Sequence, residues 1–161
     1  MIKGVSLFSS AGIAETYFKK AGIDIVVANE LIESRAKLYS FLYPNAKMIV
    51  GDITDSGIFN QINSQIKKEN CKFLIATPPC QGMSSLGKKD YVNDKRNYLV
   101  FYVLDIIEDN DFDFILIENV PKFLKLFFPF NGELKKLVDI LKIKFSNKYK
   151  NIVVEVIYNG S

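Results

Sequence analysis

Histidine and tryptophan are absent from this sequence of 161 residues, and cysteine occurs only twice. Without an imidazole, these residues cannot form a Ser-His-Asp or Cys-His nucleophile pair, a carboxylate-histidine relay or a zinc site built on histidine. Two thiols are also too few for a closed four-cysteine zinc site. The missing residue types therefore exclude most hydrolase and zinc chemistry, and we expect no metal site.

Long apolar runs are missing too. Stretches such as residues 98–104 and 114–117 are far shorter than the roughly 20 residues that a membrane span needs. No basic segment followed by an apolar one opens the chain, because Gly4 and two serines interrupt the first residues. We therefore expect a cytoplasmic protein that does not bind membranes, with Cys71 and Cys80 as free thiols.

The composition is that of a globular chain, with 48% apolar and 24% charged residues, and its length suits one domain with one core. A net charge of +3 is too small to indicate nucleic-acid binding by itself. Apolar runs predict strands at 3–8, 24–30, 47–50, 72–76, 113–118 and 151–157, and helical spacing predicts helices at 13–21, 31–43, 56–69, 97–110 and 132–145. This alternation predicts an α/β fold with a mostly parallel sheet and helices on both faces.

Small or polar residues follow five of the predicted strands. In such a sheet, ligands bind at the carboxyl ends of the strands, near the point where the strand order reverses. The residues at these ends are Ser9 to Gly12, Glu30, Asp52, Pro78 to Gln81, and Glu118 with Asn119. We therefore expect the functional site at this edge of the sheet.

The turn after the first strand leaves room for a ligand close to the backbone, because it consists of two serines, an alanine and Gly12. It is neither a GxGxxG motif nor a phosphate-binding loop. Glu30 is placed to accept both hydroxyls of a ribose, and Asp52 to accept from an adenine amino group. Together these residues predict a nucleoside pocket; the alternative, that they are ordinary helix caps, stays open.

Residues 77–84 (TPPCQGMS) contain the candidate nucleophile, Cys80. It follows two prolines and enters a loop with four basic residues, Lys88, Lys89, Lys95 and Arg96. An exposed thiol in electropositive surroundings favours the nucleophilic thiolate. The alternative is an inert buried cysteine, which is our interpretation of Cys71. Glu118 is either an acid beside this nucleophile or a solvated residue.

These motifs together resemble the amino-terminal part of the DNA (cytosine-5)-methyltransferase family. Residues 6–12 (SLFSSAG) are similar to the family's first methyl-donor motif, and 78–81 (PPCQ) match its nucleophile motif. Residues 94–99 (DKRNYL) are similar to the short motif that follows, and 118–120 match the ENV motif. The resemblance implies a Rossmann-like S-adenosylmethionine-dependent methyltransferase fold that is incomplete at its C-terminal side.

The resemblance also implies roles for individual residues. Cys80 adds to C6 of a cytosine flipped out of the duplex, C5 then takes the methyl group, and S-adenosylhomocysteine is the product. A protonated Glu118 hydrogen-bonds at N3 and relieves the negative charge. The implied donor contacts are Phe8, Ser10, Gly12, Ile13, Glu30, Leu31, Asp52, Ile53, Pro78 and Leu99. The implied DNA-facing residues are Gln81, Ser84, Lys88, Lys89, Arg96 and Asn119, most of them in a loop, 82–96, that closes over the DNA.

Three positions depart from the family's first motif: Ser6 replaces the usual aspartate, Ser10 the first glycine, and Ile13 the last glycine. The sequence also stops before the family's later arginine motif, its target-recognition region and its final donor-site motif. We therefore expect residues 1–161 to form one partial catalytic domain. Its expected partners are double-stranded DNA and a second protein chain that carries the missing parts.

Several alternatives remain open. The chain is a truncated or remnant gene product, a fragment prepared for structural work, or a catalytically silent protein that binds the donor or a partner. An RNA target is a further alternative, because tRNA-modifying relatives share the PPCQ pattern. The apolar segment 123–130 either contributes to a surface for the partner or packs on the domain's own core.

Overall fold

The structure, a computed structural model, describes residues 1–79 and 95–156. The chain divides into two compact units. Among the described residues, the first contains 1–79 and 95–118, and the second contains 119–156. No helix in the described part of the chain is long and apolar enough to cross a membrane.

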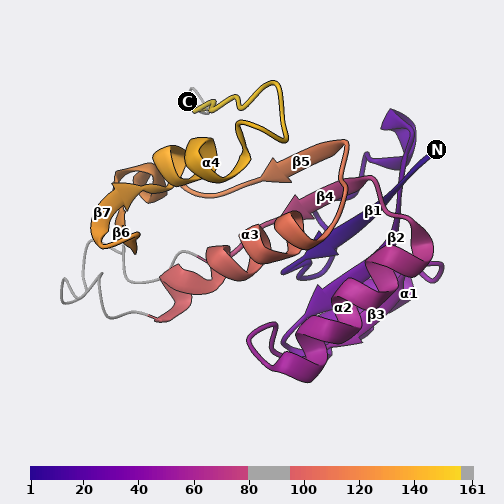
Figure 1. Cartoon of the computed structure of the whole chain (residues 1–161). Coiled ribbons are helices and arrows are strands. Elements are labelled where there is room, and N and C mark those ends of the chain that lie inside the picture. The colour runs from indigo at the N-terminus through magenta and orange to yellow at the C-terminus, as the bar shows by residue number, and fades with distance from the viewer. Residues whose placement is uncertain (80–94, 157–161) are drawn as a thin grey trace, which may run out of the picture. The chain divides into compact units, whose positions relative to one another are not determined.

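A five-stranded parallel sheet forms the centre of the first unit, in the order β3-β2-β1-β4-β5 (Figure 1). The strands are β1 (Ile2–Leu7), β2 (Ile23–Glu30), β3 (Lys47–Val50), β4 (Phe73–Ala76) and β5 (Phe114–Ile117). The chain runs outward from β1 to β3 and then returns to the other side of β1, so the strand order reverses between β1 and β4. The predicted α/β fold with a mostly parallel sheet is confirmed, and its switch point lies between the carboxyl ends of β1 and β4.

Helices cover the sheet of this first unit. They are α1 (Glu33–Leu42), α2 (Ser56–Glu69) and α3 (Leu99–Asp109). Right-handed crossovers place α1 on one face and α2 with α3 on the other, which is the near face in Figure 1. The last two helices touch, since the Asn63 side chain donates a hydrogen bond to Asp109 at 3.1 Å and the rings of Phe59 and Tyr102 lie edge to face.

The buried residues explain why these segments form this sheet. All four residues of β4 and the last four of β1 are buried, as expected for strands covered on both faces. In α3 the fully buried residues recur at helical spacing, at Val100, Val103, Leu104, Ile106 and Ile107. A continuous apolar run therefore marks a central strand here, and a period near 3.6 marks the helix that covers it.

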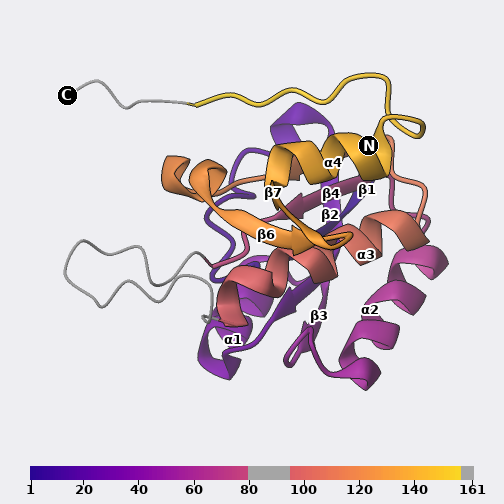
Figure 2. The same ribbon diagram turned by 60° about the vertical axis from the view of Figure 1, so that its left-hand side comes forward.

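The second unit contains an antiparallel hairpin, β6 (Phe127–Phe130) and β7 (Glu133–Lys136), followed by α4 (Leu137–Phe145) (Figure 2). Phe123 and Phe128 of this unit are both buried, with ring centroids 5.7 Å apart. The interpretation of segment 123–130 as packing on the protein's own core therefore holds for these two rings. Phe127 of the same segment is 54% exposed.

Two predicted helices differ from the structure. Residues 132–136 are strand or turn, because Asn131 and Gly132 adopt left-handed conformations, which start a hairpin rather than a helix. Residues 13–18 form successive tight turns, and only Lys19–Ala21 is a 3₁₀ helix. In that segment the Thr16 hydroxyl donates to the Ile13 carbonyl, so a side chain competes for the acceptor that an α-helix would use.

The sixth predicted strand is also wrong. Residues 151–156 are described and lie in no strand, and residue 157 falls outside the described residues. An apolar, β-branched run becomes a strand only where another strand pairs with its backbone. The hydrophobic pattern alone carries no information about that pairing.

Candidate functional site

The carboxyl ends of the five strands lie at one level. Leu7 is in register with Asn29 on one side and Ala76 on the other, and Ala76 is in register with Ile117. The loops that follow therefore share one edge of the sheet, in the order Asp52, Glu30, the turn 8–12, the segment 77–79 that leads to Cys80, and Glu118. The structure thus brings these predicted positions together at the switch point of the sheet.

The turn after β1 has an unusual backbone. Phe8, Ser10 and Gly12 have φ angles of 58°, 51° and 79°, all in the left-handed region. A non-glycine residue pays about 1 to 2 kcal/mol for this conformation, so other contacts must hold the turn in place. At Gly12 a side chain is also excluded by space, since a Cβ there would lie 2.3 Å from the Tyr43 ring.

Glu30 is one of those contacts. One carboxylate oxygen accepts the Ser10 N–H at 2.8 Å, and the other accepts the Ile32 N–H at 2.9 Å. The side chain is buried, yet each oxygen of a carboxylate has two acceptor sites, so both oxygens keep acceptor capacity. Glu30 therefore shapes the turn, and its expected bonds to a ribose remain a prediction.

The residues expected near an adenine differ in exposure. Ile53 is buried, whereas the Asp52 side chain is exposed and accepts the Thr54 N–H at 2.9 Å. Ile13 and Leu31 are apolar but 81% and 61% exposed. Their expected contacts with a donor remain a prediction.

Asn29 and Thr77 also hold this edge together, and sequence reasoning missed both. The Asn29 amide donates to the carbonyls of Ile49 and Gly51, at 2.9 and 3.1 Å, and so ties β2 to the end of β3. The Thr77 hydroxyl donates to the Phe8 carbonyl at 3.0 Å and ties the end of β4 to the turn. Their position at or just after the end of a buried strand was the only sequence signal that would have found them.

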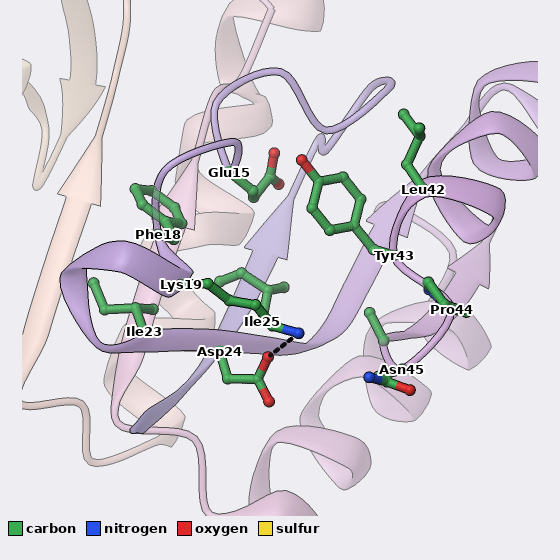
Figure 3. A pocket seen from close by; sticks show the side chains of 11 residues that line it. Glu15, Phe18, Lys19, Ile23, Asp24, Ile25, Leu42, Tyr43, Pro44 and Asn45 are labelled. Carbon is green, nitrogen blue, oxygen red and sulfur yellow. Dashed lines mark ion pairs between the residues drawn. The ribbon is translucent and has the colours of Figure 1, made fainter.

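Tyr43 was missed as well, since it lies just after α1 and far from any motif. Its hydroxyl donates to the Gly12 carbonyl at 2.6 Å, and its ring packs on Tyr39 with centroids 4.7 Å apart. Figure 3 shows this side chain reaching from the end of α1 toward the turn segment. It fixes the carbonyl group at the apex of the turn.

Replacing Tyr43 with phenylalanine should therefore loosen the turn while keeping the ring. We expect a loss of about 1 kcal/mol in the free energy of unfolding, the usual worth of one hydrogen bond. Urea unfolding measures this loss. Tyr17→Phe, at a residue that is 69% exposed, is the matched control and should change stability little. Equal effects of the two variants would contradict the role of the Gly12 contact.

The candidate nucleophile and most of the DNA-facing residues lie outside the described residues: Cys80, Gln81, Ser84, Lys88 and Lys89. The structure describes Pro78, which is buried, the half-buried Leu99 at the start of α3, and Arg96, which is exposed in the 3₁₀ helix Lys95–Tyr98. Of the predicted loop 82–96, the structure therefore describes only the last two residues, 95 and 96.

The two acidic or polar positions after β5 are both described. The Glu118 N–H donates to the Ala76 carbonyl at 3.0 Å, and its side chain is exposed. Ala76 is four residues before Cys80, so the two segments leave the sheet side by side. Asn119 belongs to the second unit, where its side-chain oxygen accepts the Val120 N–H at 2.8 Å.

Cys71 behaves as a structural residue. It is only 3% exposed, and burial raises the pKa of its thiol to about 12. A thiol with such a pKa carries almost no thiolate at neutral pH. The sequence-based interpretation of Cys71 as inert is confirmed.

A cavity of about 170 Å³ lies in the first unit (Figure 3). Its lining extends from Glu15 and Tyr43 to the amino-terminal residues of β2 and the segment after α1, and Lys19 pairs with Asp24 there at 3.9 Å. Because Glu30 lies at the opposite end of β2, we do not assign this cavity to the predicted nucleoside pocket.

Comparisons with known proteins agree with the geometry. The sequence model of the family described as C-5 cytosine-specific DNA methylase matches residues 2–146. Type II methyltransferase M1.HgaI of Avibacterium volantium is 49% identical over 152 residues, which cover 92% of this chain and 43% of that protein. Type II methyltransferase M.AquIA of a Picosynechococcus species is 33% identical over 121 residues, which cover 73% of this chain and 48% of that protein.

A third relative is the tRNA (cytosine(38)-C(5))-methyltransferase of Spodoptera frugiperda, which is 30% identical over 125 residues, 75% of this chain and 36% of that protein. The chain thus spans less than half the length of each of these relatives. A crystal structure assigned as a DNA modification methyltransferase, encoded within a prophage of E. coli, superposes with a TM-score of 0.60. It is 24% identical and covers 75% of this chain and 32% of its own, so it shows a shared fold. With the family model matching nearly the whole sequence, this chain belongs to the C-5 cytosine-specific DNA methylase family.

Proposed function

We propose that this chain carries the methyl-donor site and the nucleophilic cysteine of a methyltransferase that acts on C5 of cytosine in double-stranded DNA. The main support is the order of groups along the carboxyl edge of the sheet. The turn 8–12 and Glu30 stand on one side of the switch point, and the segment leading to Cys80 stands on the other, next to Glu118. Donor and nucleophile are needed side by side in this reaction.

The described residues fit S-adenosylmethionine as the donor. The turn has small residues at 9–12, where Ser10 and Gly12 adopt left-handed conformations, and Ile13 next to it presents apolar surface, as does Leu31 after β2. Glu30 has acceptor sites left for ribose hydroxyls, and Asp52 with Ile53 would face the adenine, with Pro78 and Leu99 completing the donor contacts. When bound, S-adenosylmethionine supplies an electrophilic methyl group on a sulfonium centre.

The chain's own residues would then drive the chemistry on the base. The Cys80 thiolate forms a bond to C6 of the flipped cytosine, and the electrons of the C5–C6 double bond make C5 nucleophilic. A protonated Glu118 donates to N3 and offsets the charge that builds on the ring. After C5 has taken the methyl group, a water molecule would accept the C5 proton, the electrons of the C5–H bond would re-form the C5–C6 double bond, and the Cys80–C6 bond would break to regenerate the thiolate. No step needs a histidine.

Target recognition is proposed to come from outside these residues. The chain spans less than half of its relatives, and the basic loop residues Lys88, Lys89 and Arg96, with Gln81, Ser84 and Asn119, would contact phosphates and the flipped base rather than read a sequence. A second protein chain that carries the arginine motif and the recognition region is the proposed partner.

An RNA target is the second candidate, because one relative is named as a tRNA methyltransferase. The similarity to M1.HgaI is higher, at 49% identity over 92% of this chain, and the matched family is described as a DNA methylase. We therefore favour DNA as the substrate.

Nucleoside mass spectrometry tests the proposal. The chain, with and without the proposed second chain, is incubated with S-adenosylmethionine and either duplex DNA or tRNA. We expect 5-methyl-2′-deoxycytidine in the DNA and no 5-methylcytidine in the tRNA. Methylated tRNA alone would shift the function to RNA. No product from either substrate, in a protein that still binds the donor, would support the silent donor-binding protein instead.

A further inference from the structure

A buried acid lies beneath the turn at the switch point, and none of the roles above uses it. Glu15 is 4% exposed, and Ser6, near the end of β1, is 2% exposed. The Ser6 hydroxyl donates a hydrogen bond to one carboxylate oxygen of Glu15. The other oxygen has no hydrogen-bond partner among the described residues. The pair joins the strand before the turn to the segment after it.

Burying the Glu15 carboxyl group beneath the turn costs free energy of desolvation. Burial raises the pKa of the Glu15 carboxyl, because the charged form loses its water, and the hydrogen bond from Ser6 acts in the opposite direction. A buried carboxyl group with one unsatisfied oxygen lowers the free energy of unfolding. Glu15 also adds to the rise in the pKa of the fully buried Tyr39 hydroxyl, so the two groups are close.

The hydrogen bond joins residues on either side of the turn. Ser6 belongs to β1, and Glu15 follows nine residues later, just beyond Gly12. In Figure 3 the side chains of Glu15 and Tyr43 extend toward each other beneath the loop of the turn.

We propose that Glu15 is a positioning residue that fixes the donor turn against the end of β1 through Ser6. The turn 8–12 lies between the two residues in sequence, so their hydrogen bond closes it into a loop. Together with Glu30 on Ser10 and Tyr43 on Gly12, this bond fixes the left-handed backbone of the turn before any donor arrives. The inference rests on the proposed donor site at this turn.

Exchanging the two ends of the pair tests the proposal. Glu15→Gln keeps the size of the side chain and leaves only a neutral hydrogen bond. Ser6→Asp sets a second carboxylate against Glu15 in a buried place, where like charges repel. In the double variant the carboxylate introduced at position 6 accepts from the amide introduced at position 15, which restores a charge-assisted bond with its ends reversed.

Isothermal titration calorimetry with S-adenosylhomocysteine, on the full chain and its second chain where needed, measures donor affinity. We expect Glu15→Gln to weaken binding by about five-fold and Ser6→Asp by more than about ten-fold, from the loss of one charged hydrogen bond and from added repulsion. The double variant should return to within about two-fold of the natural chain, a coupling that independent sites do not show. Glu33→Gln is the control, since Glu33 is an exposed acid on α1 that pairs with Lys37.

Hydrogen exchange of residues 8–15, measured without ligand, gives a second readout. Exchange should be fastest in Ser6→Asp, intermediate in Glu15→Gln, and slow again in the double variant. Binding and exchange of Glu15→Gln equal to those of Glu33→Gln, or a double variant no better than Ser6→Asp, would overturn the inference. If the natural chain does not bind S-adenosylhomocysteine, the proposed function fails, and the ranking of exchange rates still decides whether Glu15 positions the turn.

Discussion

Replacing Cys80 with serine is expected to abolish methyl transfer, with kcat at least about 1,000-fold lower, because a hydroxyl group is a far weaker nucleophile than a thiolate. Donor binding should be retained, since Cys80 is proposed to touch the base and not the donor. The rate of 5-methyl-2′-deoxycytidine formation measures the first effect, and calorimetry with S-adenosylhomocysteine measures the second.

Cys71→Ala is the matched control for this variant. Cys71 is buried, and its thiol is protonated at neutral pH because burial raises its pKa to about 12. Its loss should lower stability through a small cavity and leave the rate per folded molecule unchanged. A Cys80→Ser protein with activity within about ten-fold of the natural chain would remove Cys80 from the mechanism.

Replacing Gly12 with alanine should have the second large effect, on stability and donor affinity together. The new Cβ would meet the Tyr43 ring at 2.3 Å in a backbone with φ of 79°. Left-handed strain and overpacking together should cost about 3 kcal/mol in the free energy of unfolding. Because the turn must shift to relieve the collision, S-adenosylhomocysteine should bind at least about ten-fold more weakly, as expected when a preorganised site is displaced.

Gly22→Ala is the control that separates the effect of left-handed backbone strain from the effect of the contact with the Tyr43 ring. Gly22 has nearly the same backbone, with φ of 82°, but nothing lies within 4 Å of a Cβ placed there. This variant should cost only about 1 kcal/mol, the strain alone, and should leave donor affinity unchanged. Equal losses for the two glycines, measured by urea unfolding and calorimetry, would show that the contact with Tyr43 does not shape the site.

Sequence patterns predicted the centre of the sheet well because β4 and the end of β1 are buried on both faces. The run 73–76 is apolar throughout, so neither the strand nor its place in a parallel sheet depended on distant residues. The predictions that were wrong concern segments whose structure depends on particular side-chain contacts or on a particular turn. Residues 13–18 are diverted from a helix by side-chain bonds, and 132–136 by the left-handed Asn131-Gly132 turn, which is a hairpin signal that the periodicity of the segment obscured.

In the candidate site too, sequence patterns predicted the features that depend on local order and missed those that depend on distant partners. Strand-end positions such as Glu30 and Asp52 could be placed at one edge from the order of elements alone. The contacts that fix the turn could not, because Glu15, Tyr43 and Thr77 act across 9, 31 and 69 positions of sequence. No local pattern reports hydrogen bonds over such separations. Motif reasoning therefore finds the groups proposed to do chemistry and misses those that hold them in place.

Trapping on duplex DNA that contains 5-fluorocytosine tests the central claim most directly. Fluorine at C5 cannot leave as the proton does, so the Cys80–C6 bond should persist once the methyl group has been transferred. With S-adenosylmethionine and the second chain present, the account predicts one covalent complex, mapped by mass spectrometry to the peptide that contains Cys80. No adduct with or without a second chain, or an adduct that survives Cys80→Ser, would contradict it.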